Sequence, residues 1–142
     1  MHRHLVMRGH EYYVMHSILV LMTLPADKVT DLEQRLALEL KRGVVALAVL
    51  SALREPGYGY SLQQRLVDRG LDVDQGTLYP LLRRLDEQGL LESDWNVEGA
   101  RPRKYYRLSG DGERVLASMR GQWADLVRVV DGLLESSEGE PS

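Results

Sequence analysis

Basic side chains gather between residues 95 and 107, next to several aromatic residues. This segment carries a net charge of +3, from four cations and one acid, in a chain whose formal net charge is −3; these residues are Arg101, Arg103, Lys104, Arg107 and Glu98. A positive segment in an acidic protein is typical of a surface that binds phosphate at one place. Charged runs are more often simply solvated surface, so the segment alone does not decide the function.

The composition excludes several catalytic chemistries. The chain has no cysteine, so disulfides, thiolate zinc sites and cysteine nucleophiles are excluded. All four histidines lie within the first 16 residues, so the rest of the chain has neither an imidazole base nor an imidazole metal ligand. No pair of acids stands out on an apolar background. We therefore expect neither an enzyme nor a metal or cofactor site, and the lack of cysteine fits a reducing cytoplasm, where we expect the protein to be located.

The first 22 residues differ from the rest. They contain four of the five methionines and follow neither a helical nor a strand period. The apolar run from Val14 to Leu24 is interrupted by polar residues and is shorter than the ~20 apolar residues that span a bilayer. We expect no membrane partner. Our hypothesis for this segment is a leader read from an early start codon, with Met15 or Met22 as the natural beginning.

A long helical pattern follows. Thr30 and Glu33 match a capping box, and leucines continue at helical spacing until Pro56 and Gly57. Gly43 either splits the pattern into two helices or lies inside one. The part from Val44 to Leu53 is apolar on nearly all sides, which predicts a buried central helix.

Two short helices come next, joined by the tight connector LDVD. The first begins near Ser61 and ends at Gly70. The second has a leucine face and an opposite face that is largely polar, which is helix-turn-helix organisation. The leucine face consists of Leu78, Leu81, Leu82 and Leu85; the opposite face consists of Gly76, Pro80, Arg83 and Glu87, flanked by Tyr79 and Arg84.

Two strands and a long helix complete the pattern. The strands are expected over residues 90–95 and 103–108, with turn residues between them. Ser109 is expected to cap a helix that runs to about Leu134. Its apolar residues step by 3, 4, 3, 4 and 3 positions, which is a heptad seam that predicts a partner helix. The seam consists of Leu116, Met119, Trp123, Leu126, Val130 and Leu133, and a second stripe of Val115, Val127 and Leu134 widens it.

Four stretches of this chain resemble the PadR family of bacterial transcriptional regulators, in its short form with a single C-terminal helix. They read LKRGVVALAVLSAL, GYSLQQRL, GTLYPLLRRLDEQGLLES and RPRKYYRLSGDGE. The resemblance covers roughly residues 31 to 135. It implies a mainly α fold with a small β-hairpin wing, that is, a winged helix-turn-helix followed by a C-terminal dimerisation helix, which binds operator DNA as a two-fold dimer.

The same resemblance implies roles for individual residues. The recognition helix would contact DNA through Gln75, Gly76, Thr77, Tyr79 and Arg83, and the wing through Arg101, Arg103, Lys104 and Tyr105 or Tyr106. The helix N-terminus would offer free N–H groups to phosphate. Tyr105 and Tyr106 must point to opposite faces of their strand, so one of them belongs to the core. The dimerisation residues would be Leu116, Met119, Trp123, Leu126, Val127, Val130 and Leu133.

Trp123 has two interpretations. It fills the dimer interface, or it contacts a small aromatic effector, as tryptophans at this helix do in drug-responsive relatives. An effector there would change the spacing of the two recognition helices and weaken operator binding.

We therefore expect four segments and one function. The segments are a leader over residues 1–22 that is disordered or not native, a winged helix-turn-helix DNA-binding domain over 23–109, a dimerisation helix over 110–135 and an acidic tail over 136–142. The expected function is sequence-specific transcriptional regulation by a homodimeric repressor. The alternative is a winged-helix module that binds other proteins and no DNA, which the acidic net charge favours.

Overall fold

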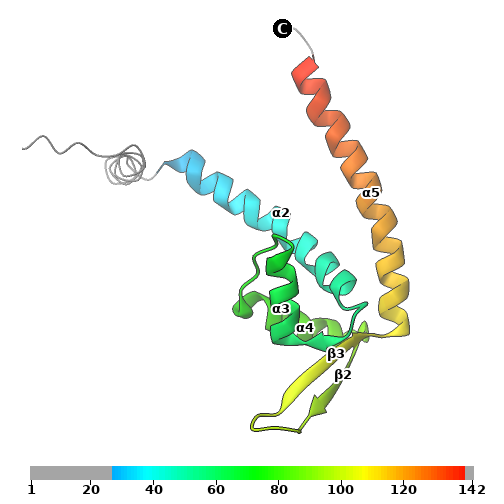
Figure 1. Ribbon diagram of the computed structural model, residues 1–142. Helices are drawn as coiled ribbons and strands as arrows, with labels where there is room; N and C mark the ends of the chain where they lie inside the picture. The colour runs from blue at the N-terminus through cyan, green and yellow to red at the C-terminus, as the bar shows by residue number, and fades with distance from the viewer. Residues whose placement is uncertain (1–26, 140–142) are drawn as a thin grey trace, which may run out of the picture. The chain divides into compact units, whose positions relative to one another are not determined.

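The computed structural model describes residues 27–139 (Figure 1). These residues belong to two compact units that meet between Lys41 and Arg42, and each is described by itself. The elements in order are α2 (Lys28–Ala52), β1 (Gly57–Tyr58), α3 (Gly59–Asp68), α4 (Gln75–Glu87), β2 (Leu91–Asn96), β3 (Arg103–Leu108) and α5 (Gly110–Gly139). The expected leader over residues 1–22 lies outside the described residues.

The start of α2 differs from the predicted capping box. Asp27 is the cap, because its Oδ1 accepts the Val29 N–H at 3.0 Å and its Oδ2 accepts the Thr30 hydroxyl at 3.3 Å. The prediction that Thr30 caps the helix is therefore wrong, and Thr30 lies in the first turn instead. Gly43 lies within α2, which runs without a break to Ala52.

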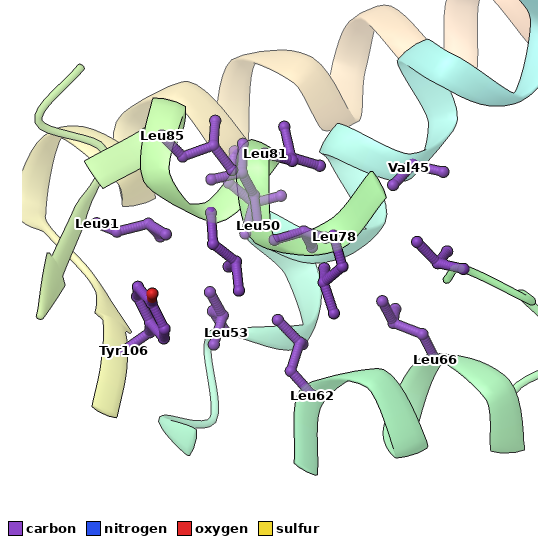
Figure 2. Packing of buried hydrophobic residues seen from close by; sticks show 14 residues of the cluster. Val45, Leu50, Leu53, Leu62, Leu66, Leu78, Leu81, Leu85, Leu91 and Tyr106 are labelled. Carbon is purple, nitrogen blue, oxygen red and sulfur yellow. The ribbon is translucent and has the colours of Figure 1, made fainter. Parts of the chain in front are cut away.

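The core of the second unit is built mainly from leucines of three helices. Val45, Val49 and Leu50 of α2 are buried, as the apolar pattern predicts, and Leu53 just after the helix is 1% exposed. Figure 2 shows these side chains meeting the leucines of α3 and α4. The remaining buried members of the cluster are Leu62, Leu66, Val73, Leu78, Leu81, Leu82, Leu85, Leu91, Tyr106 and Leu116.

Helices α3 and α4 form the predicted helix-turn-helix. The connector begins at Gly70, whose φ of +92° lies in the left-handed region that favours glycine. It is held by Gln63, which donates from Nε2 to the Val73 carbonyl at 2.9 Å. Arg65 ties α3 to the end of α2, since its Nη1 donates to the carbonyls of Ala52 at 2.9 Å and Glu55 at 2.8 Å.

The strands form a three-stranded antiparallel sheet in the order β1-β3-β2. β3 has the predicted limits, and β2 is shifted by one residue from them. β1 was not predicted, because its two residues are too short to show a strand period. The register pairs Leu91 with Leu108 and Asn96 with Arg103, so the β2–β3 hairpin forms a wing that extends away from the core (Figure 1).

The first turns of α5 pack on this core. Ser109 is the predicted cap, since its Oγ accepts the Gly112 N–H at 3.0 Å. Leu116 is 5% exposed and belongs to the core, and Met119 is partly buried against it. This end of the predicted seam is therefore covered within the chain. From Trp123 onward the apolar side chains are exposed, and α5 continues to Gly139 rather than ending near Leu134.

Within residues 27–139, no helix is both long enough and apolar enough to cross a membrane.

Candidate nucleic-acid interface

Helix α4 presents a polar face because its other face is anchored in the core. Leu78, Leu81, Leu82 and Leu85 are buried, at 0 to 7% exposure, as the leucine spacing predicts. The remaining positions therefore point outward. The exposed residues of α4 include all five that the sequence proposed for DNA contact: Gln75, Gly76, Thr77, Tyr79 and Arg83.

The N-terminus of α4 carries an acidic side chain. Asp74 is the N-cap, and its Oδ1 accepts the Thr77 N–H at 2.7 Å. The expectation of free N–H groups at this terminus is therefore wrong for Thr77. The carboxylate also offsets the partial positive charge of the helix end, which makes this terminus a poor site for phosphate. The leading turn is better suited to base edges.

A cleft of about 480 Å³ is lined by residues of α4 and of the wing. Five of its residues come from α4 and β3 and were predicted from the sequence, whereas the aromatic residues from β1, α3 and β2 were not. The lining consists of Tyr58, Gly59, Tyr60, Tyr79, Arg83, Trp95, Pro102, Arg103, Lys104 and Tyr106. Cations and aromatic rings on facing walls suit a phosphodiester chain, whose phosphates need charge and whose sugars pack on rings.

Tyr79 lies against the backbone of Gly59. A methyl group on Gly59 would come within 2.6 Å of the Tyr79 ring, so only glycine permits this close approach. The Tyr79 side chain remains 39% exposed, which leaves it accessible beside the cleft. The sequence signal for this contact was the glycine between two tyrosines in GYGY.

Arg103 is exposed and is oriented by an aromatic cluster at the base of the wing. Its guanidinium lies 4.6 Å from the centre of the Tyr58 ring. The Tyr58 hydroxyl accepts from Asn96 Nδ2 at 2.6 Å, and the Tyr58 ring meets Tyr105 edge-on at 5.1 Å. Tyr105 therefore supports the ring that orients Arg103.

Lys104 lies on the face of the wing that meets α4. Its Nζ is 3.3 Å from Asp86 Oδ2, and the same oxygen accepts the Ser93 hydroxyl at 2.6 Å. The ammonium also lies 5.7 Å from the centre of the Trp95 ring and 5.8 Å from that of Tyr106. Lys104 is thus held between a carboxylate of the recognition helix and two aromatic rings of the wing.

Tyr106 is the core member of the tyrosine pair. It is 6% exposed, so Tyr106 is the tyrosine of this pair that belongs to the core. We therefore expect no direct contact of the Tyr106 ring with DNA. Burial raises the pKa of its phenol above the ordinary value, and the nearby negative charge of Asp86 raises it further. The positive charge of Arg83 acts in the opposite direction.

Arg107 does not add to the free positive charge of the wing. Its Nε is 3.0 Å from Glu92 Oε2 and its Nη1 is 2.8 Å from Asp94 Oδ2, and hydrogen bonds to Asp94 first and then Glu92 raise its pKa. Both acids lie just before the segment 95–107. Over residues 91–108 the four cations oppose three acids, so the net charge is +1 rather than +3.

The remaining predicted DNA residues lie outside the cleft. Arg101 is exposed in the loop between β2 and β3, and residues 75–77 form the leading turn of α4. The cleft therefore combines the middle of the recognition helix with the base of the wing. Trp95 was missed, although its position opposite Lys104 in the hairpin register was a usable signal.

A second cavity adjoins Trp123. It has a volume of about 310 Å³ and is lined by α2 and α5, through Val44, Leu47, Ala48, Ser51, Leu116, Arg120 and Trp123.

Known proteins resemble this chain in sequence and in fold. The Transcriptional regulator PadR-like family matches residues 47–118. Transcriptional regulator Rv3488 of Mycobacterium tuberculosis is 38% identical over 95 residues, which cover 66% of this chain and 89% of that protein. The crystal structure of a PadR family transcriptional regulator from Eggerthella lenta is 48% identical, with a TM-score of 0.71 over 78% of this chain and 98% of that one. A PadR-like transcriptional regulator from Bacillus cereus is 29% identical, with a TM-score of 0.61 over 68% of this chain and 96% of that one. The mainly helical winged-helix fold and the family predicted from the sequence are confirmed, and the chain belongs to the PadR-like family of transcriptional regulators.

Proposed function

We propose that this protein is a homodimeric repressor that binds operator DNA through α4 and the wing. The observation that carries the proposal is the cleft, where Tyr79 and Arg83 of α4 face the cations of β3. A DNA strand whose bases are read by α4 runs past this cleft, so its backbone meets both elements.

In this proposal α4 contacts both bases and phosphates, whereas the wing contacts phosphates only. The leading turn of α4, residues 75–77, enters the major groove, where Gln75 and Thr77 hydrogen-bond to base edges. Gly76 has no side chain and allows close approach. Tyr79 and Arg83 bind phosphate oxygens at the rim of the groove, and Arg103 and Arg101 bind phosphates along the wing. These phosphate contacts position the protein but do not specify the sequence.

The exposed part of α5 supports dimerisation. The predicted seam places Trp123, Leu126 and Val130 on one face of α5. Their side chains are 44%, 59% and 47% exposed, so this apolar face is uncovered in the single chain. A second copy of α5 covers such a face by packing at heptad spacing. Val127 and Leu133 extend the same apolar surface, at 37% and 66% exposure. Two-fold pairing then presents two recognition helices to two half-sites about 34–36 Å apart.

The cavity beside Trp123 supports an effector site. Its volume of about 310 Å³ suits a small planar molecule, its walls are mainly apolar, and the indole provides a stacking surface. Because the cavity lies between α2 and α5, an aromatic effector bound there alters the position of α5 and relieves repression. Quenching of the Trp123 fluorescence by a planar aromatic dye, absent from a Trp123→Phe variant, is the expected sign.

The function is tested by selection of bound duplexes from a random DNA pool. The expected result is enrichment of an inverted repeat whose half-sites are about 10 base pairs apart, centre to centre. An Arg83→Ala variant is expected to bind the selected duplex more weakly. The Glu87→Gln variant is the matched control, because Glu87 is exposed on the same helix but lies outside the cleft.

The rival function is a protein-binding module, which the small net charge of the wing favours. It predicts that no duplex is retained in the selection, at any salt concentration. Repression itself is tested by transcription in vitro from a promoter that contains the selected sequence. Addition of the protein is expected to lower transcript yield, whereas a higher yield would identify an activator.

A further inference from the structure

The negative charge of Asp86 lies at a place in α4 where it does not stabilise that helix. It lies in the last turn of α4, where the helix dipole disfavours a negative charge. Its side chain is only 24% exposed. The contacts that compensate for this placement lie on the wing, at Ser93 and Lys104.

The same carboxylate oxygen makes both contacts. Asp86 Oδ2 accepts the Ser93 hydroxyl of β2 at 2.6 Å and lies 3.3 Å from the ammonium of Lys104 on β3. One atom of the recognition helix thus holds both strands of the wing. Lys104 is 31% exposed and lines the cleft, so a DNA phosphate in the cleft competes with Asp86 for the ammonium.

We propose that Asp86 is a positioning residue that determines specificity, because it holds Lys104 away from DNA of arbitrary sequence. This inference rests on the proposed DNA-binding function. Binding to arbitrary DNA depends on the number of cations that are free to replace counterions. A cation already paired with a carboxylate contributes little to that number. Operator DNA, docked by base contacts along α4, brings a phosphate into the cleft and recruits Lys104.

The expected effects follow from this competition. In Asp86→Asn the amide oxygen still accepts the Ser93 hydroxyl, but the charge that holds Lys104 is gone. On random duplex, the slope of log K against log salt should steepen by about 0.9 for each protomer, or about 1.8 for the dimer. Over a fourfold range of salt concentration, this extra slope changes the affinity of Asp86→Asn relative to that of the wild-type protein by roughly twelvefold. Affinity for the operator should change much less, so the ratio of specific to non-specific binding should fall.

The test measures these slopes by fluorescence anisotropy for the full chain, three single variants and the double variant Asp86→Asn/Lys104→Met. Glu87→Gln removes the same charge from the adjacent position, and Lys104→Met removes the restrained cation. Asp86→Asn should steepen the slope on random duplex more than Glu87→Gln does, and adding Lys104→Met should cancel the gain. Lys104→Met alone should weaken operator binding but leave the random-duplex slope unchanged. This last result decides the proposal if Asp86→Asn does not fold.

The outcomes separate the two proposals. If the wild-type protein shows no salt-dependent binding to any duplex, the proposed function fails, and this inference fails with it. If the wild-type protein binds but Asp86→Asn and Glu87→Gln have equal slopes, only the role of Asp86 is refuted. A random-duplex slope that falls by about 1.8 in Lys104→Met would also refute it, because Lys104 would then be free in the wild-type protein.

Discussion

Arg103 and Arg107 lie four positions apart on the same strand, yet we expect only Arg103 to contribute to DNA affinity. Arg103 is exposed above the Tyr58 ring, with its charge accessible to phosphate. Arg107 is held by two carboxylates at 2.8 and 3.0 Å. Substitution of each arginine by glutamine removes the same charge, and therefore tests whether position or total charge governs binding.

The magnitude follows from counterion release. Each phosphate contact contributes about 0.9 to the slope of log K against log salt, so Arg103→Gln in a two-fold dimer should lower the slope by about 1.8. When the salt concentration rises from about 50 to about 200 mM, the affinity of both proteins falls. The factor by which it falls should be roughly twelvefold smaller for Arg103→Gln than for the wild-type protein. Arg107→Gln should change the slope by much less, because its two acids already neutralise the guanidinium.

Fluorescence anisotropy of a labelled operator duplex measures both slopes. Circular dichroism of each variant checks that the wing and helices are intact. Equal losses of slope in the two variants would refute this reasoning, since they would show that total charge alone governs binding. A larger loss in Arg107→Gln would place the DNA nearer the Arg107 end of β3 than the Arg103 end.

Three further predictions concern assembly and stability. Leu126→Glu should convert the dimer to a folded monomer, because the side chain is 59% exposed within the chain, and sedimentation that still shows a dimer would contradict the role of α5. Gly112→Ala should lower the free energy of unfolding by about 1–3 kcal/mol, because the new methyl group meets the carbonyl oxygen of Leu90; an unchanged denaturation midpoint would exclude that close packing. Burial raises the pKa of Tyr106 above 10.0, so its contribution to stability is full below that pH and is lost as pH rises through the folded-state pKa. Denaturation at about pH 9 and about pH 11 should show this loss in the wild-type protein but not in Tyr106→Phe.

Much of the fold could be predicted because apolar spacing determines it locally. The leucines of α4 recur at helical spacing, and all four are buried. β3 has the predicted limits. β1 could not be predicted, because a two-residue strand is defined only by its pairing with Tyr105 and Tyr106. The cap at Asp27 was missed because the capping-box pattern at Thr30 competes with it in the sequence.

The site was only partly predictable, because the positive charge that an arginine or lysine offers to DNA depends on whether a nearby acid pairs with it. The sequence identified the cations of the wing, but not that Glu92 and Asp94 of the neighbouring strand neutralise Arg107. Such pairs require the strand register, in which Glu92 lies opposite Arg107. The seam of α5 shows the same limit. Its spacing is regular throughout, and only the packing of Leu116 on the core separates the covered end from the exposed one.

The central claim is that α4 and the wing bind a specific DNA sequence. Its most direct test is the affinity of the full chain for duplex DNA from immediately upstream of its own gene, compared with a scrambled duplex across a salt series. The account predicts binding that is at least about 1000-fold tighter to the upstream sequence and that weakens steeply with salt. Equal, weak and salt-independent binding to both duplexes would contradict it.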